Sequence, residues 1–419
     1  MRNCLLSLLL LGSSLLADAQ DTLQLPSPFA TKSYRGYGYV MGWQPGETPK
    51  APFGMGVTLY ADNLQNPRSL YQLPNGDVLV VEANSNHSFF TKVGAVVLGA
   101  NKSNSMKRSS NRITLLRDTN HDGFPDQRFT FLSNLNQPFG ILLLNNKLYV
   151  ANTDALWCFP YHNGDTIIRA AGQKIATFPA GKNNIHWTRN IIANPAGTKI
   201  YIAIGSGSDH AEDGIENEVQ RATVIEMNPD GSNQRIYASG LRNPVGMAWE
   251  PTTNTLWTVV NERDKMGNDL VPDYMTGIKD GGFYGWPYYY YGKRPDPRVK
   301  VNPDYANANV VVPDFTLGAH TASLGLIFYT GNKFPERYHN GAFIAQHGSW
   351  NRKPISGYKV LFVPFKDGMP AGPPEDFLTG FVYNEKEKIV KGRPVALLQL
   401  NDGSVLLTDD KTNRIWRIQ

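Results

Sequence analysis

One strand–turn–strand pattern recurs six times along this 419-residue chain. Each copy has a short apolar run, a turn containing Asn, Asp or Gly, and a second apolar run. The copies begin at Pro67, Pro138, Thr188, Pro244, Ser323 and Pro394. Apolar strands joined by turns pair as antiparallel hairpins, and a repeated unit of this kind buries its apolar faces against neighbouring copies. The pattern therefore predicts an all-β protein, a six-bladed β-propeller of four-stranded antiparallel sheets.

The spacing of the repeats predicts long loops between strands. Successive copies start 71, 50, 56, 79 and 71 residues apart, whereas a minimal propeller blade needs only about 40–45 residues. No segment shows a sustained helical period, so we expect helices to be few and short. We expect residues 56–61 and 413–418 to pair, because a propeller that is not closed leaves exposed strand edges. No linker divides the chain, which favours one domain over residues 20–419.

Residues 1–19 have the features of a cleaved signal peptide. Arg2 precedes an apolar run from Leu5 to Leu16, and the segment ends in the A-x-A pattern of residues 17–19. A buried N-terminal helix is the alternative interpretation. After cleavage Cys158 is the only cysteine, so we expect no intramolecular disulfide. We expect a periplasmic or secreted protein with no transmembrane segment after signal cleavage.

Composition excludes several classes of protein. The chain has 20 Tyr, 19 Phe and 8 Trp, enough core material to exclude a disordered chain. The formal charge is +5 with no run of Lys or Arg, so we expect no nucleic-acid partner. The sequence contains no Gly-rich nucleotide fingerprint, no nucleophile elbow, no paired Cys/His metal motif and no haem-attachment motif.

Oxygen-bearing side chains are spaced as in calcium-binding loops between residues 118 and 126. Asp118, Asn120, Asp122 and Asp126 hold relative positions 1, 3, 5 and 9, and Gly123 stands at position 6. Calcium loops use such spacing because a hard cation needs several oxygens at about 2.3–2.6 Å. The bidentate Glu of position 12 is missing here. A second, structural calcium site and an Asx-rich surface turn therefore both stay open.

Loops that lead into or out of the hairpins carry basic and polar residues. On a propeller such loops gather at one end, where a His can act as a general base and Arg can bind carboxylates. Each residue taken singly is equally typical of a structural side chain or a solvated turn. The candidates are His186, Arg189, Arg242, Asn243, Arg263, Asp264, His347, Arg352, Lys391 and Arg393.

These motifs, in this order, resemble the soluble quinoprotein sugar dehydrogenases, which depend on pyrroloquinoline quinone (PQQ). The resemblance runs from about Asn66 to Ile418 and is strongest over residues 186–287, where Gly-Leu-Arg-Asn-Pro, Asn-Glu-Arg-Asp and Phe-Tyr-Gly-Trp-Pro follow one another. The motifs are most similar to the L-sorbosone dehydrogenase branch. The resemblance implies a PQQ- and Ca²⁺-dependent enzyme that oxidises a sugar or a related polyol or aldehyde by hydride transfer to the quinone. It also implies an external electron acceptor, a cytochrome or a quinone.

The resemblance implies roles for individual residues. His186 matches the catalytic base, and Arg263 and Asp264 fall where loop carbonyls bind the calcium of the cofactor site. Val245 stands where the glucose enzymes have Gln, and the cofactor-binding Lys of the fifth blade has no clean counterpart. The residues that the resemblance assigns to PQQ are Arg189, Arg242, Asn243, Lys391 and Arg393, with His347 or Arg352 as candidates for the fifth blade.

Two other classes of function stay open. A calcium-dependent propeller lactonase would surround one metal with carboxylates and would need no cationic pocket. A non-catalytic propeller would keep the fold and bind a ligand or partner. Only the dehydrogenase would give a reducible quinone spectrum with added PQQ and Ca²⁺.

Overall fold

The computed structural model describes residues 23–85, 103, 108–181 and 183–419. The predicted signal peptide, residues 1–19, lies outside the described residues. Within the described part the helical elements are short 3₁₀ turns, as expected from the sequence: η2 (Ile215–Glu218), η3 (Pro303–Tyr305) and η4 (Glu336–Tyr338). In the same residues no helix has both the length and the apolar character needed to cross a membrane.

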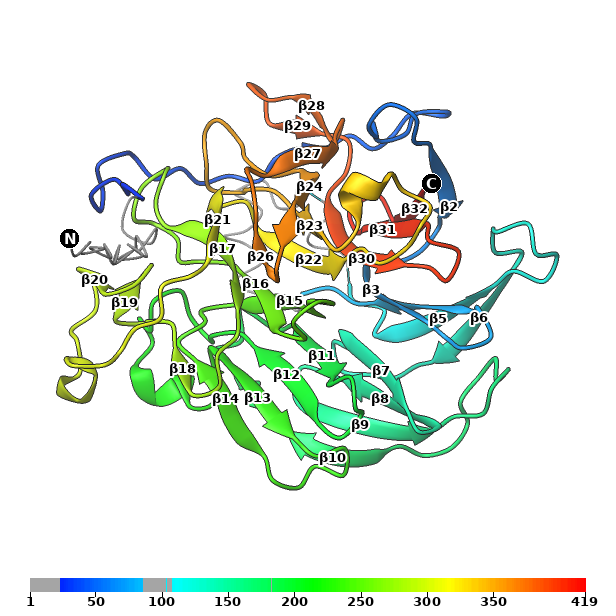
Figure 1. The fold of residues 1–419 in the computed structure, drawn as a ribbon, viewed down its shortest axis with the longest axis horizontal. Coiled ribbons are helices and arrows are strands. Elements are labelled where there is room, and N and C mark those ends of the chain that lie inside the picture. The colour runs from blue at the N-terminus through cyan, green and yellow to red at the C-terminus, as the bar shows by residue number, and fades with distance from the viewer. Residues whose placement is uncertain (1–22, 86–102, 104–107, 182) are drawn as a thin grey trace, which may run out of the picture.

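Six sheets of four or more strands make up most of the described chain (Figure 1). The first three contain β3 (Pro67–Gln72), β4 (Val78–Glu82), β5 (Arg112–Arg117) and β6 (Gln127–Leu132); β7 (Gly140–Leu144), β8 (Lys147–Ala151), β9 (Ala155–Pro160) and β10 (Gln173–Thr177); and β11 (Arg189–Ala193), β12 (Ile200–Ile204), β13 (Thr223–Met227) and β14 (Arg235–Ser239). In the third sheet β14 also pairs in parallel with β18 (Gly282–Phe283).

The strands of the other three sheets come from the later part of the chain, except for β2 (Val57–Ala61). These sheets contain β15 (Pro244–Trp249), β16 (Leu256–Val260), β17 (Pro272–Gly277) and β21 (Phe315–Ala319); β22 (Ser323–Phe328), β23 (Ala342–Gln346), β24 (Lys359–Val363) and β27 (Glu375–Leu378); and β30 (Pro394–Gln399), β31 (Val405–Asp409), β32 (Arg414–Ile418) and β2. All six predicted hairpins form, each as the first two strands of a sheet.

Smaller sheets lie outside these six. β1 (Tyr39–Val40) pairs in parallel with β29 (Ile389–Val390), which also pairs with β28 (Val382–Asn384). Two short hairpins join β19 (Tyr289–Tyr290) to β20 (Arg294–Pro295) and β25 (Phe365–Lys366) to β26 (Met369–Pro370).

The first strands of the six sheets surround a shared axis. β3 contacts β7, and contacts then follow from β7 to β11, β15, β22 and β30, and from β30 back to β3. Residues of all six strands line a cavity of about 260 Å³. The fold is therefore all-β and propeller-like, and Figure 1 shows the sheets following one another around the middle of the molecule in chain order.

Glycines allow the first strands to approach one another closely. A Cβ atom on Gly246 in β15 would lie 2.7 Å from the Leu324 carbonyl oxygen in β22. A Cβ on Gly325 in β22 would lie 2.4 Å from the Val395 carbonyl oxygen in β30. Real Cβ atoms do not approach a carbonyl so closely, so glycine is needed at both positions.

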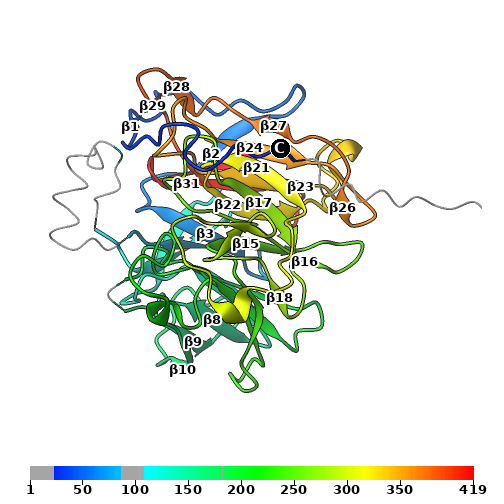
Figure 2. The same ribbon diagram turned by 90° about the vertical axis from the view of Figure 1, so that its left-hand side faces the viewer.

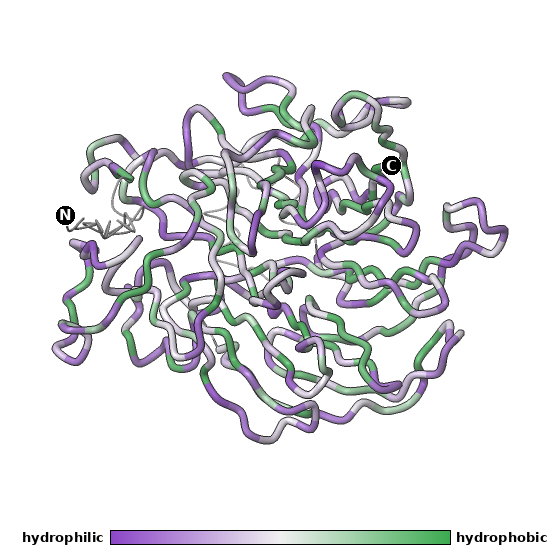
Figure 3. Tube along the Cα trace, in the orientation of Figure 1, coloured by the Kyte–Doolittle hydropathy of each residue, from purple (hydrophilic) through white to green (hydrophobic). Residues whose placement is uncertain are grey.

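Branched and aliphatic residues fill the spaces between sheets. β4, β12, β16 and β31 are buried at all five positions, as expected for strands covered on both faces. One core cluster joins Leu79 and Val81 of β4 to Leu148 and Val150 of β8 in the next sheet. Figure 3 shows the hydrophobic residues along the strands and hydrophilic residues in many outer turns.

Segments near the two ends of the chain share a sheet. β2 pairs antiparallel with β32, and Val57 lies opposite Ile418. This confirms the predicted pairing of residues 56–61 with residues 413–418. In each hairpin the start of the first strand lies beside the end of the second. The loops that carry most of the candidate residues therefore open at one end of the sheets.

Candidate functional site

His186 lies in the loop before β11 and is held through its Nδ1 atom. Nδ1 lies 2.9 Å from Ser206 Oγ and 3.0 Å from the Ser206 carbonyl oxygen. The Ser206 hydroxyl donates its own proton to the Ser208 carbonyl oxygen at 2.6 Å, so both Ser206 oxygens act as acceptors toward the ring. The neutral ring therefore carries its hydrogen on Nδ1 and has a lone pair on Nε2. A lone pair on Nε2 is what a general base requires.

The surroundings of His186 keep the ring neutral. Burial lowers its pKa well below the usual value for histidine, and the Arg242 guanidinium lowers it further. The Ser206 carbonyl and Asp209 act in the opposite direction, and Arg189 adds to the lowering. His186 is therefore available as a proton acceptor at neutral pH and below it.

Arg189 is fully buried and holds the backbone next to His186. It donates from Nη1 to the His186 carbonyl oxygen at 2.8 Å and from Nη2 to the Pro179 carbonyl oxygen at 2.7 Å. Burial, with Arg221 nearby, lowers the pKa of Arg189 to about 9. Its contacts are with carbonyl groups, so it positions the His186 segment.

A buried ion pair joins the loops of the third and fourth sheets. Arg242 Nη2 lies 2.8 Å from Asp209 Oδ1, and Arg242 Nη1 donates to the Glu262 carbonyl oxygen at 2.6 Å. The Asp264 N–H donates to the same Asp209 oxygen at 2.8 Å, and Asp264 Oδ2 lies 3.6 Å from Arg242 Nη2. The structure thus brings Arg242 and Asp264 together around Asp209.

Asn243 and His186 meet at Gly205. A Cβ atom on Gly205 would lie 2.4 Å from Asn243 Oδ1 and 2.5 Å from His186 Cβ, so only glycine leaves room for both side chains. Asn243 Nδ2 is 3.4 Å from Asn261 Oδ1. Among the described residues nothing donates to the buried Asn243 Oδ1. A buried acceptor without a donor is costly, which makes this amide a candidate contact for a ligand.

The side chain of Arg263 points into the fourth-sheet loop. It pairs with Glu262 at 3.0 Å and Asp296 at 3.3 Å, and it donates to the Pro287 and Tyr289 carbonyl oxygens. Its main chain is therefore the part left for the predicted calcium. Asp264 Oδ1 accepts from Asn351 Nδ2 at 2.6 Å.

Asp410, which no sequence motif singled out, collects three basic side chains. Asp410 Oδ1 accepts from His347 Nε2 at 2.8 Å, and Oδ2 lies 2.8 Å from Arg68 Nη1 and 3.0 Å from Lys411 Nζ. All are buried except His347, which is half-buried. Burial alone would raise the pKa of Asp410, but Lys411, His347 and Arg68 hold it well below its usual value.

Arg393 lies beside this cluster. Its guanidinium donates to the His347 carbonyl oxygen at 2.8 Å and to the Gly348 carbonyl oxygen, and it lies 5.3 Å from the ring centre of Tyr358. Burial, with Arg393 nearby, lowers the pKa of His347 to about 3, so this ring is neutral. The Arg393 N–H donates to Asp409 Oδ1 at 2.9 Å, so Arg68, Lys411 and Arg393 place three positive charges near two buried carboxylates, Asp409 and Asp410.

Arg352 and Lys391 contact other parts of the molecule. Arg352 pairs with Asp269 at 2.8 Å and donates to the Asn268 carbonyl oxygen. Lys391 pairs with Glu47 at 2.8 Å, and its ammonium lies 5.6 Å from the Trp43 ring. The cofactor roles expected for these two residues stay predictions.

The loop from Asp118 to Asp126 joins β5 to β6 at the opposite end of the sheets. The Asp126 carboxylate accepts from the Thr119 N–H at 2.9 Å, and Asp118 Oδ2 accepts from the Gly123 N–H at 2.7 Å. Asp122 Oδ1 accepts from the Phe124 N–H at 2.8 Å. These bonds are those of an Asx-rich turn, and calcium at this loop stays a prediction.

One acidic group with metal-ligand spacing lies in the loop after β12. Ligand atoms of Asp209, His210 and Glu212 all lie within 4.8 Å of one another. Arg242 already pairs with Asp209, and Arg298 Nη1 lies 3.6 Å from it. This positive charge disfavours a metal ion at the group.

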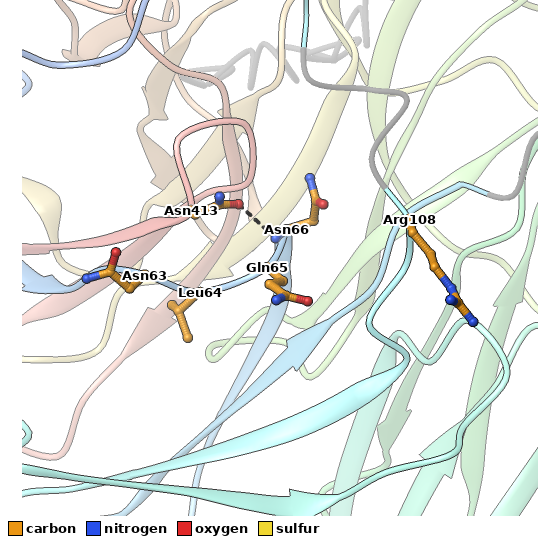
Figure 4. Close-up of a pocket in the computed structure, with 6 residues that line it drawn as sticks. All are labelled: Asn63, Leu64, Gln65, Asn66, Arg108 and Asn413. Carbon is orange, nitrogen blue, oxygen red and sulfur yellow. Dashed lines mark hydrogen bonds between the residues drawn. The ribbon is translucent and has the colours of Figure 1, made fainter. Parts of the chain in front are cut away.

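A cavity of about 410 Å³ lies beside the Asp410 cluster. Asn63, Leu64, Gln65, Asn66, Arg108 and Asn413 line it (Figure 4). The Asn66 N–H donates to Asn413 Oδ1 at 3.0 Å, the dashed line in Figure 4. Asn66 Nδ2 donates to the Asp410 carbonyl oxygen at 3.0 Å, so the wall of this cavity is tied to the cationic cluster.

Comparisons of the sequence find related proteins. A family model described as Glucose / Sorbosone dehydrogenase matches residues 64–349, and one described as TrAA12-like matches residues 293–419. An uncharacterized protein of Borreliella burgdorferi is 27% identical over 383 residues, which cover 88% of this chain and 90% of that protein. The pyrroloquinoline quinone-dependent pyranose dehydrogenase of Coprinopsis cinerea is 33% identical over 124 residues, covering 26% of this chain and 16% of that enzyme. The aldose sugar dehydrogenase YliI of Escherichia coli is 28% identical over 155 residues, which cover 33% of this chain and 39% of that enzyme.

Solved structures with similar folds come from related enzymes. The holo PQQ domain of pyranose dehydrogenase from Coprinopsis cinerea has a TM-score of 0.70 at 20% identity and covers 91% of this chain and 100% of that chain. The calcium structure of a Trichoderma reesei family AA12 carbohydrate-active enzyme has a TM-score of 0.71 at 17% identity. The match covers 95% of this chain and 98% of that chain. At these identities the likeness shows the fold.

Proposed function

The chain belongs to the glucose/sorbosone dehydrogenase family, and from this we propose that it is a PQQ- and calcium-dependent oxidoreductase. Its substrate is a sugar or a related polyol or aldehyde, and its electrons pass to an external cytochrome or quinone. The proposal takes residues 20–419 as one six-bladed propeller domain. It also takes the mature protein as periplasmic or secreted after loss of residues 1–19.

The observation that carries the proposal is the cluster of buried cations beside the neutral ring of His347. Arg68 and Lys411 are buried against the Asp410 carboxylate, and Arg393 is buried beside them with its N–H bound to the Asp409 carboxylate. Three buried cations and two carboxylates leave a net positive charge, whose burial is costly and which a polyanionic ligand would offset. Among the described residues, Arg68 Nε and Asn243 Oδ1 are also buried without a hydrogen-bond partner. A planar tricarboxylate such as PQQ matches both the charge and the unused polar atoms.

The residues present therefore fit the cofactor. Arg68, Lys411 and Arg393 would hold its carboxylates through charge-assisted hydrogen bonds. The Asp264 carboxylate and the Arg263 main-chain oxygen are the candidates for calcium, because the Asn261, Glu262 and Asp264 carbonyl oxygens accept from Arg242 and Arg298. When bound, the quinone supplies the two-electron acceptor that no side chain of this chain offers.

The chain's own contribution to the chemistry is the movement of a proton. His186 Nε2 accepts the proton from the hydroxyl on the substrate carbon that is oxidised. The Ser206 oxygens hold Nδ1–H and so keep Nε2 unprotonated and oriented. Arg242 disfavours the protonated ring, which promotes release of the proton to solvent.

Reconstitution tests the proposal. The purified protein is titrated with PQQ and Ca²⁺, and absorbance is followed while sugars are added with and without an artificial electron acceptor. We expect a quinone spectrum that one or more sugars reduce. A spectrum that no sugar, polyol or aldehyde changes would contradict the proposal, and lactone hydrolysis without PQQ would support the lactonase instead.

A further inference from the structure

Residues 23–50, which we call the N-terminal arm, are fixed against the loops at the site end. On one side the hydroxyl oxygens of Thr31 and Ser33 accept from the N–H groups of Asn268 and Gly267 at 2.8 and 3.1 Å. On the other side β1 pairs with β29, and Figure 2 shows these two strands side by side. The segment between these two anchors contains Tyr37. The arm is therefore held at both sides of this residue.

Two glycines fix the position of Tyr37. A Cβ atom on Gly38 would lie 2.7 Å from the Lys388 carbonyl oxygen, so a larger residue would push the arm away from β29. Gly36 has a φ of 137°, which side chains of L-residues rarely permit. Tyr37 is therefore placed by its backbone as well as by its ring contacts.

Tyr37 stacks on Trp350, which follows the fifth-sheet strand β23. The ring centres are 5.7 Å apart and the planes differ by 21°. Burial raises the pKa of Tyr37. The charge of Arg393 lowers this pKa and the charge of Asp264 raises it, so the phenol lies within electrostatic range of both residues. Within the described part of the chain the Tyr37 hydroxyl has no hydrogen-bond partner.

The aromatic pair lies nearer to solvent than the cations. Arg242, Arg393 and Lys411 are 3%, 6% and 5% exposed, whereas Tyr37 and Trp350 are half-buried. A cofactor that the buried cations hold would lie deeper, and a substrate that arrives from solvent would meet the aromatic rings next to it. An aromatic face packs well against the C–H face of a sugar ring, and a phenol hydroxyl can bind one of its hydroxyls.

We propose that Tyr37 of the N-terminal arm and Trp350 form the contact surface for the ring of a pyranose substrate. The proposal rests on the proposed function and narrows its substrate class to cyclic sugars over open-chain polyols, which lack such a face. It also makes the N-terminal arm, which lies outside the six sheets, part of substrate recognition.

The test compares Tyr37→Ala and Tyr37→Phe with a matched control on the same arm, Tyr39→Ala, whose side chain is 49% exposed. Steady-state kinetics are measured with pyranoses and open-chain polyols, and PQQ affinity is measured by titration. Binding of the same sugars to PQQ-free, calcium-loaded protein is measured by saturation-transfer difference NMR. Thermal unfolding confirms that each variant is folded.

We expect Tyr37→Ala to raise KM for pyranoses about tenfold, with kcat and PQQ affinity within about twofold. The saturation-transfer signals of the sugar ring protons should fall in Tyr37→Ala, persist in Tyr37→Phe and be unchanged in Tyr39→Ala. Unchanged pyranose KM and ring signals in Tyr37→Ala would overturn the proposal. An equal loss of PQQ and sugar affinity would also overturn it, by assigning Tyr37 to the cofactor. If no sugar reduces PQQ in the wild type, the proposed function fails, and the NMR comparison still decides this inference.

Discussion

At the scale of single residues, the state of His186 follows from its neighbours. Two neutral oxygens of Ser206 hold Nδ1–H, and no carboxylate contacts the ring in the described structure. The ring is thus a weak but correctly oriented base. The three predictions at this scale test the base, the hydrogen bond that orients it and one cation of the Asp410 cluster.

Replacing His186 should remove turnover and leave the rest of the site intact. We expect His186→Gln to lower kcat by about 10²–10⁴, because that is the usual contribution of a general base. PQQ and Ca²⁺ binding should be unchanged in the same titrations. His162→Gln is the control, since His162 is exposed. Near wild-type turnover in His186→Gln would assign the base elsewhere, with His347 as the next candidate.

A carboxylate at position 206 should move the acid limb of the pH profile. In the wild type the pKa of His186 lies well below the usual value, so activity should persist into acidic pH. An anion next to Nδ1 favours the protonated ring and raises its pKa by about one unit or more. In Ser206→Asp the acid limb of kcat/KM should therefore lie at higher pH, whereas Ser206→Ala should leave it near the wild-type position. NMR titration of the His186 ring measures the same shift without turnover.

Loss of Arg68 should weaken cofactor binding. Truncating one partner of a buried, hydrogen-bonded charge pair costs about 2–5 kcal/mol. Arg68→Met should therefore weaken PQQ binding at least tenfold. Arg128→Met is the control, because Arg128 is an exposed residue of β6. Equal PQQ affinity in the two variants would remove Arg68 from the site.

At the scale of elements, the features that could be predicted are those that depend on residues close together in the sequence. The six hairpins and the pairing of β2 with β32 could be predicted because alternating apolar residues and turn residues are properties of neighbouring positions. The role of Asp410 could not, because Thr-Asp-Asp-Lys at 408–411 is typical of an ordinary strand end. Lys411 is its neighbour in the sequence, but Arg68 and His347 reach it only when the first, fifth and sixth sheets meet. Ser206 and Tyr37 were missed for the same reason.

The loop from Asp118 to Asp126 gives the prediction at this scale. If it binds calcium, chelation should lower the melting temperature of the PQQ-free protein, and Asp122→Ala should abolish that effect. Asp122→Ala should reduce thermal stability more than activity, because the loop lies at the end of the sheets opposite His186. The control is Asp376→Asn, since Asp376 is an exposed residue of β27. A melting temperature that does not change on chelation would exclude calcium at this loop and leave the Asx-rich surface turn as its interpretation.

At the scale of the whole molecule, the close approach of the six first strands fixes the positions of the loops of the six sheets relative to one another. A methyl group at Gly246 would press on the Leu324 carbonyl oxygen in the next sheet. We expect Gly246→Ala to lower the free energy of unfolding by about 1–3 kcal/mol, the usual cost of overpacking. In Gly181→Ala, where a Cβ meets no atom within 4 Å, stability should be nearly unchanged. Denaturant unfolding of both variants measures the difference.

The pairing of β2 with β32 also determines when folding can finish. Strands 57–61 and 414–418 form one sheet although nearly the whole chain separates them. During synthesis the early strand keeps an unsatisfied edge until residues 414–418 have emerged. Contacts of such long sequence separation form slowly, because loop closure must precede their stabilising effect. The sheet that contains β2 is therefore the sheet whose completion waits longest for its partner strand.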